Sequence, residues 1–252
     1  MESVVVLSGG MDSATLLWKE YAETGGSCAA VSIDYGQRHD IELTRAEALC
    51  NRLGVGWRCV DLTGLGDVLS GSALTSPEVA VPHGHYAEES MKVTVVPNRN
   101  MILLAVATGY AITKKAKRIC YAAHAGDHAI YPDCREEFAS AMASAIGLCD
   151  WHPIELSRPF VHNTKADIVR MGHDLGVPFE LTWSCYEGGL GDDGQIHCGA
   201  CGTCVERIEA FDLAGVPDPT QYRNRVAGVP VLDVDSTEDA VRLAVDAAKA
   251  MK

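Results

Sequence analysis

The chain has 252 residues, of which 47% are hydrophobic and 22% are charged, a composition that excludes disordered and collagen-like proteins. Its 21 basic and 34 acidic residues give a net charge of −13, which argues against a nucleic-acid partner because phosphate binding needs clustered Lys and Arg. The ten cysteines are too dilute for a small disulfide scaffold.

The N-terminus has neither the basic segment nor the long apolar segment of a signal peptide. The longest apolar run, residues 101–112, is shorter than the roughly 20 residues that span a bilayer. We therefore expect a cytoplasmic protein without a membrane partner, whose cysteines are thiols, catalytic groups or metal ligands.

Short apolar runs alternate with helical patterns along the chain. Strands are predicted at residues 4–7, 28–34, 57–62, 118–123 and 152–156, and helices at 12–23, 38–53, 99–113, 133–149 and 164–175. Continuous apolar strands between helices predict an α/β fold with a doubly wound, mainly parallel, Rossmann-like sheet. Residues 73–92 lack periodicity and predict a lid-like loop.

The pattern changes after residue 182, where glycine, aspartate and cysteine become frequent. The expected organisation is an α/β domain over 1–182, a small metal-binding subdomain over 183–215, and a C-terminal extension over 216–252. The extension is expected to contain a helix that a capping box opens at Ser236.

A glycine-rich string, S-G-G-M-D-S, joins the first strand to the first helix. Glycines allow close approach to a ligand, and a helix N-terminus attracts phosphate. The string is neither a Walker A motif nor G-x-G-x-x-G, and the plainer alternative is a tight turn with Asp12 as the helix cap. The predicted nucleotide-binding residues are Leu7, Ser8, Gly9, Gly10, Met11, Asp12, Ser13, Ala14, Thr15, Leu16 and Leu17.

Four cysteines have the spacing C-x12-C-x2-C-x2-C, with glycines at the turns. Four thiolates complete a tetrahedral structural zinc site, while an iron–sulfur cluster is the alternative. His197 could replace one ligand, although a position on the loop surface is the simpler expectation. The predicted ligands are Cys185, Cys198, Cys201 and Cys204.

Further polar residues stand where strands end and helices begin. Arg38 and His39 follow the second strand, at the edge where open α/β sheets bind ligands. Arg99 could clamp phosphate, and Lys165 starts a helix where a lysine is unfavourable unless an anion lies nearby. Arg38 could instead be a solvated residue in a turn that starts a helix, and Lys165 could be a solvated lysine.

A polar segment around a Tyr-Pro turn follows the fourth strand. Asp127, Tyr131, Asp133 and Arg135 predict a pocket for a planar, polar ligand. The alternative is that Asp133 caps a helix and Arg135 lies on the surface.

The S-G-G-x-D-S string resembles the PP-loop of the N-type ATP pyrophosphatases. The resemblance implies that ATP, with Mg²⁺, is cleaved between its α and β phosphates and that AMP is placed on a substrate oxygen. It also implies that adenine lies against the second strand, near residues 31–35.

Six strings occur in order: S-G-G-M-D-S, D-Y-G-Q-R-H, V-P-N-R-N, Y-P-D-C-R, W-S-C-Y and C-G-A-C-G-T-C. Together, over about residues 3–212, they resemble the 7-cyano-7-deazaguanine synthase family. The resemblance implies a zinc-containing homodimer that converts 7-carboxy-7-deazaguanine and ammonia into a nitrile with ATP. The expected catalytic residues are Asp12, Ser13, Lys165 and Arg99.

The chain departs from the family pattern at Asn98, where glycine is common, and beyond about Pro217. Three alternatives stay open: another PP-loop adenylating enzyme of the tRNA thiolation or lysidine type, transfer of the deazaguanine to a protein amine, and a zinc-bearing nucleotide-binding scaffold without catalysis. The net charge argues against the tRNA enzymes.

Overall fold

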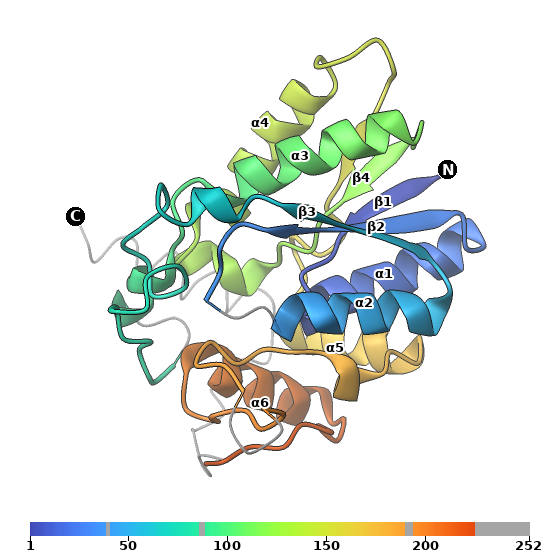
Figure 1. Ribbon diagram of the computed structural model, residues 1–252. Coiled ribbons are helices and arrows are strands. Elements are labelled where there is room, and N and C mark those ends of the chain that lie inside the picture. The colour runs from blue at the N-terminus through green and yellow to red at the C-terminus, as the bar shows by residue number, and fades with distance from the viewer. Residues whose placement is uncertain (39–40, 86–88, 190–193, 225–252) are drawn as a thin grey trace.

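The computed structural model describes residues 1–38, 41–85, 89–189 and 194–224. Five parallel strands form one sheet in the order β3-β2-β1-β4-β5 (Figure 1). The strands are β1 (Ser3–Val6), β2 (Cys28–Asp34), β3 (Gly56–Asp61), β4 (Arg118–Cys120) and β5 (Glu155–Ser157). The order reverses at β1, so the ends of β1 and β4 flank the crevice where such sheets bind ligands.

Helices cover both faces of the sheet (Figure 1). One face packs on α1 (Met11–Thr24), α2 (Ile41–Leu53) and α5 (Lys165–Asp174), and the other on α3 (Arg99–Thr113) and α4 (Glu136–Ile146). A sixth helix, α6 (Gly202–Ala214), packs against α5.

Alternation along the strands explains the two layers. Val4 packs in the core that contains Leu104 of α3, whereas Val5 packs in the core that contains Leu17 of α1. Both valines are completely buried, as expected for a strand covered on both sides. The predicted doubly wound α/β fold is confirmed.

Several predicted boundaries are wrong. The helix expected from Asp133 begins at Glu136, because Pro132–Cys134 forms a 3₁₀ turn and Arg135 is extended. The strand expected at 118–123 ends at Cys120, and the one expected at 152–156 is Glu155–Ser157. Helix α6 was not predicted, because its glycine and cysteine start resembles a loop and it is buried on most sides.

The expected lid segment is held in place at several points. At the start of the segment, Ala73 N donates a hydrogen bond to Val93 O. Further along, Gly84 N donates to Ala200 O at 3.1 Å, which ties the segment to residues 183–215, here called the cysteine segment. A 3₁₀ helix covers Glu89–Thr94. Residues 86–88 and the helix expected from Ser236 lie outside the described residues.

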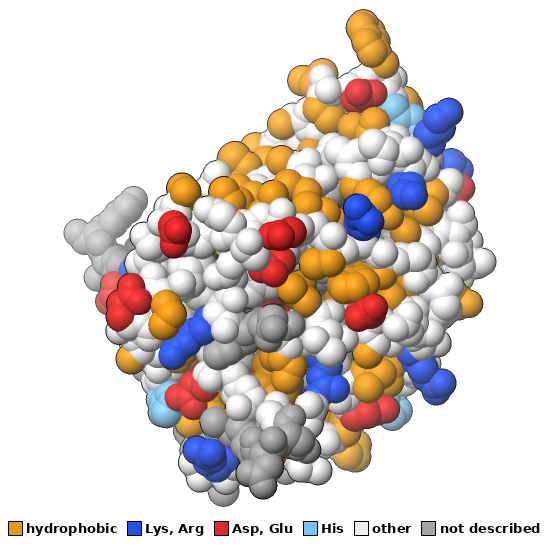
Figure 2. Space-filling model, in the orientation of Figure 1, with side chains coloured by type: hydrophobic (Ala, Val, Ile, Leu, Met, Phe, Trp, Pro, Cys, Tyr) orange, Lys and Arg blue, Asp and Glu red, His pale blue; other side chains and the backbone are white. Residues whose placement is uncertain are grey.

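Within the part of the chain that the structure describes, no helix is both long enough and apolar enough to cross a membrane. The face drawn in Figure 2 carries acidic and basic side chains scattered among apolar and neutral ones.

Candidate active site

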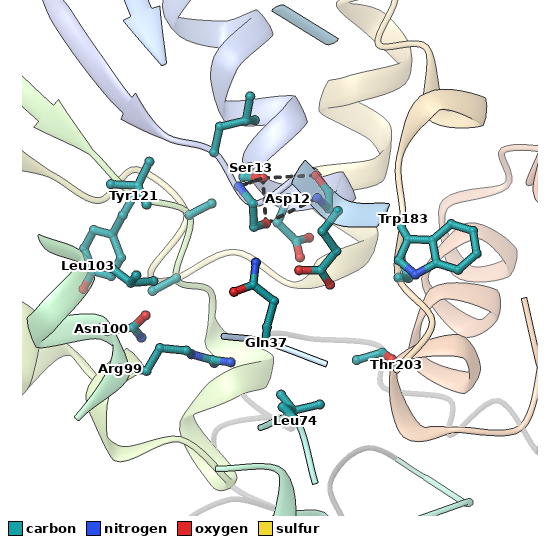
Figure 3. Close-up of a pocket in the computed structure, with 18 of the residues that line it drawn as sticks. Asp12, Ser13, Gln37, Leu74, Arg99, Asn100, Leu103, Tyr121, Trp183 and Thr203 are labelled. Carbon is teal, nitrogen blue, oxygen red and sulfur yellow. Dashed lines mark hydrogen bonds between the residues drawn. The ribbon is translucent and has the colours of Figure 1, made fainter. Parts of the chain in front are cut away.

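A cavity of about 260 Å³ opens at the carboxyl edge of the sheet (Figure 3). Its walls come from the ends of β1, β2 and β4, from the first turns of α1, α2, α3 and α5, and from the segment around Trp183. The cavity therefore lies at the point where the strand order reverses.

The glycine loop forms one wall of this cavity. Ser8 N donates to Ser13 Oγ at 3.2 Å, and Ser13 Oγ donates to Gly10 O at 3.2 Å, which folds the loop over the start of α1. Gly10 is the N-cap of α1 and supplies no side-chain cap. The N–H groups of the first turn are thus left for a ligand, the arrangement that binds anions.

Only glycine fits at the second position of the loop. Gly9 has φ +89°, and a Cβ there would lie 2.1 Å from the carbonyl oxygen of Glu42. The backbone of the loop is thereby pressed against the first turn of α2.

The predicted nucleotide-binding segment divides into two parts. Six of its residues line the cavity: Leu7, Ser8, Gly10, Met11, Asp12 and Ser13. Ala14, Thr15, Leu16 and Leu17 are completely buried in α1, and the three apolar ones pack in the core.

A chain of charged side chains links the glycine loop to two other elements. Lys165, the first residue of α5, lies 3.3 Å from Asp12 Oδ2 and 2.6 Å from Glu206 Oε2 of α6. Burial alone would lower the pKa of Lys165, but the carboxylates of Asp12 and Glu206 hold it well above its ordinary value. Lys165 is therefore a permanent cation inside the cavity wall.

His124 orients the same cluster from the end of β4. Its Nδ1 accepts a hydrogen bond from Gly126 N at 3.1 Å, so Nε2 carries the ring proton. Nε2 faces Asp127 Oδ2 at 3.5 Å and Asp12 Oδ2 at 3.8 Å. The histidine is 1% exposed and holds the two aspartates toward the cavity.

The other oxygen of Asp12, Oδ1, is buried and has no hydrogen-bond partner among the described residues. A carboxylate oxygen of this kind beside a phosphate-binding loop fits a divalent cation, because Mg²⁺ bridges carboxylates and substrate phosphates in such sites. The residues present are thus compatible with Mg²⁺.

Arg99 enters the cavity from the start of α3 (Figure 3). Its guanidinium lies over the ring of Tyr131, 5.5 Å from the ring centroid. Asn98, where the family pattern has glycine, has φ +60° and caps the helix. Asparagine tolerates this left-handed conformation, so the departure leaves the geometry intact.

Only some of the residues predicted to contact a planar ligand line the cavity. Asp127 and Arg38 line the cavity, whereas His39 lies outside the described residues. Tyr131, Asp133 and Arg135 are not among the lining residues.

Each of those three is engaged elsewhere. Tyr131 contacts Thr94 Oγ1 at 2.6 Å, and Asp133 accepts from Asn100 N at 3.0 Å at the start of α3. Arg135 is exposed and donates to His128 O. Asp133 and Arg135 therefore match the alternative prediction of a helix-capping aspartate and a surface arginine. The helix that Asp133 caps is α3, not the helix that follows it in the chain.

Several lining residues have no role in the sequence predictions, among them Gln37, Glu42, Trp183 and Thr203. Burial raises the pKa of Glu42 to about 7, against the opposing charge of Arg99. A glutamate inside a helix gives no local signal that it faces a cavity. Gln37 and Trp183 do lie in the strings D-Y-G-Q-R-H and W-S-C-Y.

The four predicted cysteine ligands come together, with Sγ atoms all within 4.8 Å of one another and buried. Backbone N–H groups point at the sulfurs, as in Cys201 N to Cys198 Sγ at 3.2 Å and Cys198 N to Cys185 Sγ at 3.3 Å. All four are free cysteines. Four close sulfurs that accept N–H groups suit one thiophilic metal ion.

His197 is neither on the surface nor in this group, which corrects the expectation for it. Its ring stacks on Trp183 with centroids 4.0 Å apart, and Nε2 accepts from Ser184 N at 3.2 Å. Burial lowers its pKa to about 3, so the ring is neutral. His197 thus connects the cysteine segment to a wall of the cavity.

The chain matches the protein family described as queuosine biosynthesis protein QueC over residues 2–215. It is 51% identical over 222 residues to a 7-cyano-7-deazaguanine synthase of Caldicellulosiruptor bescii. The aligned region covers 88% of this chain and 97% of the relative. The synthase of Methanoregula boonei is 49% identical, with 88% and 99% covered. That of Brucella anthropi is 52% identical, with 89% and 94% covered.

Among solved structures, an NH3-dependent NAD synthetase from Campylobacter jejuni aligns with a TM-score of 0.43 and 13% identity, covering 71% of this chain and 66% of that chain. A predicted subunit of a tRNA methyltransferase from Methanocaldococcus jannaschii aligns with a TM-score of 0.44 and 15% identity, covering 70% and 74%. Both scores are too low to support a functional conclusion.

Proposed function

The chain belongs to the QueC family of queuosine biosynthesis proteins, and we propose that it carries out the family's reaction with the cavity at the β1–β4 crevice as its active site. It is an ATP-dependent ligase that converts 7-carboxy-7-deazaguanine and ammonia into 7-cyano-7-deazaguanine. The observation that carries this conclusion is about 50% identity across nearly the full length of relatives with that name.

The chemistry requires the carboxylate to be activated twice. A carboxylate is a poor electrophile, so AMP is first attached to one of its oxygens and pyrophosphate leaves. Ammonia then displaces AMP to give an amide. Attachment of a second AMP to the amide oxygen allows that oxygen to leave as well, which yields the nitrile. Such steps depend on positioning and electrostatic stabilisation.

ATP binds along the glycine loop in this proposal. The phosphates lie over the first turn of α1, where Ser8 and Ser13 add hydroxyl groups, and adenine lies against Ile33 and Tyr35 of the cavity wall. Asp12 would hold Mg²⁺, which would neutralise phosphate charge when bound. Lys165 and Arg99 supply positive charge from two further sides.

The deazapurine occupies the remaining part of the cavity. Asp127 and Arg38 are the polar contacts that we propose for it among the predicted substrate residues. Tyr131 and Asp133 support the site indirectly and do not contact the ligand. Tyr131 packs under Arg99, and Asp133 accepts a hydrogen bond from the start of α3.

We propose zinc for the four cysteines, one ion per chain and with a structural role. Four thiolates leave no coordination position for a reactant, and no step of the reaction transfers an electron. The metal therefore fixes the segment 183–215, which contributes Trp183 and Thr203 to the cavity. We also propose a homodimer in the cytoplasm, where ATP is available and thiols stay reduced.

The experiment is to incubate the full chain with 7-carboxy-7-deazaguanine, ATP, Mg²⁺ and ammonium. We expect 7-cyano-7-deazaguanine and AMP, both dependent on all four components. The Ser13→Ala variant loses about 10²-fold in rate because the loop loses its internal hydrogen bonds. Ser27→Ala, at an exposed position before β2, is the matched control and keeps full activity.

Each alternative function has a distinct outcome in this assay. ATP binding without AMP release would indicate a scaffold. A deazaguanine adduct on a protein amine would indicate a transfer enzyme, and AMP release that requires tRNA would indicate a tRNA-modifying enzyme.

A further inference from the structure

Glu42 lies in the first turn of α2, and its side chain lines the cavity beside the glycine loop. Its own carbonyl oxygen is the atom that backs Gly9. No described residue forms a hydrogen bond or an ion pair with its carboxyl group. Asp12, by contrast, is paired with Lys165, and so is Glu206. Glu42 thus has a carboxyl group without a partner among the described residues, and this residue lines the cavity that we propose for the reactants.

The proposed reaction removes every proton from one nitrogen. One carboxylate, one ammonium ion and two ATP give one nitrile, two AMP, two pyrophosphates and two protons. Nitrogen enters with four N–H bonds and leaves with none; two of these protons finish on pyrophosphate and two in solvent. A group in the cavity that accepts protons from nitrogen would accelerate both halves of the reaction.

We propose that the Glu42 carboxylate is the catalytic base that takes these protons, an inference that rests on the proposed function. In the first half it accepts a proton from the nitrogen as the C–N bond forms and the C–O bond to AMP breaks. In the second half it accepts the N–H proton of the activated amide, whose electron pair becomes the third C–N bond as AMP leaves. Glu42 is only partly buried, so each proton can pass to solvent.

The surroundings of Glu42 favour this role over a structural one. The charged and titratable groups that face it are Arg99 from α3, Tyr35 from the end of β2 and Tyr186 from the cysteine segment. Burial raises the pKa of Glu42 to about 7, with Arg99 opposing. A general base works best when its pKa lies near the working pH. Because the ionised form is active, this base is present above pH 7 and is lost as pH falls below it.

Asp12 and Asp127 are less suited to the task. Asp12 is committed to Lys165 and faces His124 Nε2, and Asp127 Oδ2 faces the same nitrogen at 3.5 Å. Both carboxylates are therefore already engaged by side chains of the cavity wall.

The test separates adenylation from the nitrogen steps. Exchange of labelled pyrophosphate into ATP, with 7-carboxy-7-deazaguanine and no ammonia, reports the first activation alone. Nitrile formation with ammonium reports the whole reaction. We expect Glu42→Gln to retain exchange but to lose about 10²- to 10⁴-fold in nitrile formation. Glu42→Asp restores part of the loss, because it keeps a carboxylate.

Two controls sharpen the comparison. Glu47→Gln changes an exposed glutamate of the same helix and alters neither rate. Hydroxylamine, which is largely unprotonated at neutral pH, traps the first adenylate as a hydroxamate, and its nitrogen then loses one proton, whereas ammonium loses two in forming the amide. The deficit of Glu42→Gln is therefore smaller with hydroxylamine than with ammonium.

The outcomes distinguish the inference from the function on which it rests. Full nitrile formation by Glu42→Gln, or an equal loss of exchange and nitrile formation, would overturn the role of Glu42 and leave the ligase intact. An equal loss would indicate a binding role instead. No exchange by the wild-type chain would overturn the ligase and the inference together.

Discussion

Gly9 occupies a backbone conformation and a gap that together exclude a side chain. The Gly9→Ala variant meets two costs, the left-handed conformation at φ +89° and a Cβ 2.1 Å from Glu42 O. We expect its free energy of unfolding to fall by about 3 kcal/mol or more. Pyrophosphate exchange should fall too, because the loop has to move away from α2.

Gly25→Ala is the matched control for this prediction. Gly25 has φ +60° but no atom within 4 Å of a Cβ, so it meets only the conformational cost of about 1–2 kcal/mol. Urea unfolding of both variants measures the difference. Equal losses of stability would show that the contact with α2 does not constrain the loop.

Individual cavity residues can be predicted from the sequence where they belong to a local motif, and not where only tertiary packing brings them to the cavity. Ser8, Asp12 and Ser13 belong to a motif whose glycines and helix start already imply an anion site. Glu42 and Glu206 are ordinary helical glutamates, and only the packing of α2 and α6 turns them toward the cavity or toward Lys165.

Helix α6 connects the cysteine cluster with the cavity. Its N-cap is Cys201, its first turn contains Cys204, and Glu206, two residues after Cys204, reaches Lys165. Removal of the metal should therefore loosen the start of α6. A strong zinc chelator is expected to lower the melting temperature by on the order of 10 °C, and added Zn²⁺ should restore it.

Single cysteine variants test whether the metal is bound by the four-cysteine cluster. Cys204→Ser should contain less than a tenth of the metal of the wild-type chain by elemental analysis, since a missing thiolate weakens a tetrahedral site strongly. Cys149→Ser alters an exposed free cysteine and should keep a full complement. Iron with inorganic sulfide in place of zinc would contradict the proposed metal.

The elements themselves follow from the sequence where local pattern and tertiary role agree. Strand β2 and helix α3 have the predicted bounds, because a buried apolar run and a long apolar helix are clear patterns. Strands β4 and β5 are short, and their ends are set by where they pair with neighbouring strands. Local sequence pattern does not show where that pairing stops. Helix α6 owes its position to the cysteine cluster and α5.

For the whole molecule, the doubly wound α/β class is the most predictable feature, because strands that alternate with helices favour a parallel sheet covered on both faces. The order β3-β2-β1-β4-β5 is known from the structure alone. The net charge of −13 suits a small-molecule ligase better than an enzyme that binds tRNA.

In the proposed reaction, both oxygens of the substrate carboxylate leave on AMP. Substrate labelled with ¹⁸O in both carboxylate oxygens tests it, with mass spectrometry of the nucleotides that are released. We predict that the nitrile contains no label, that two AMP form per nitrile, and that each AMP carries one ¹⁸O. Unlabelled AMP, or label in inorganic phosphate released with ADP, would show that the carboxylate is not activated twice by adenylation.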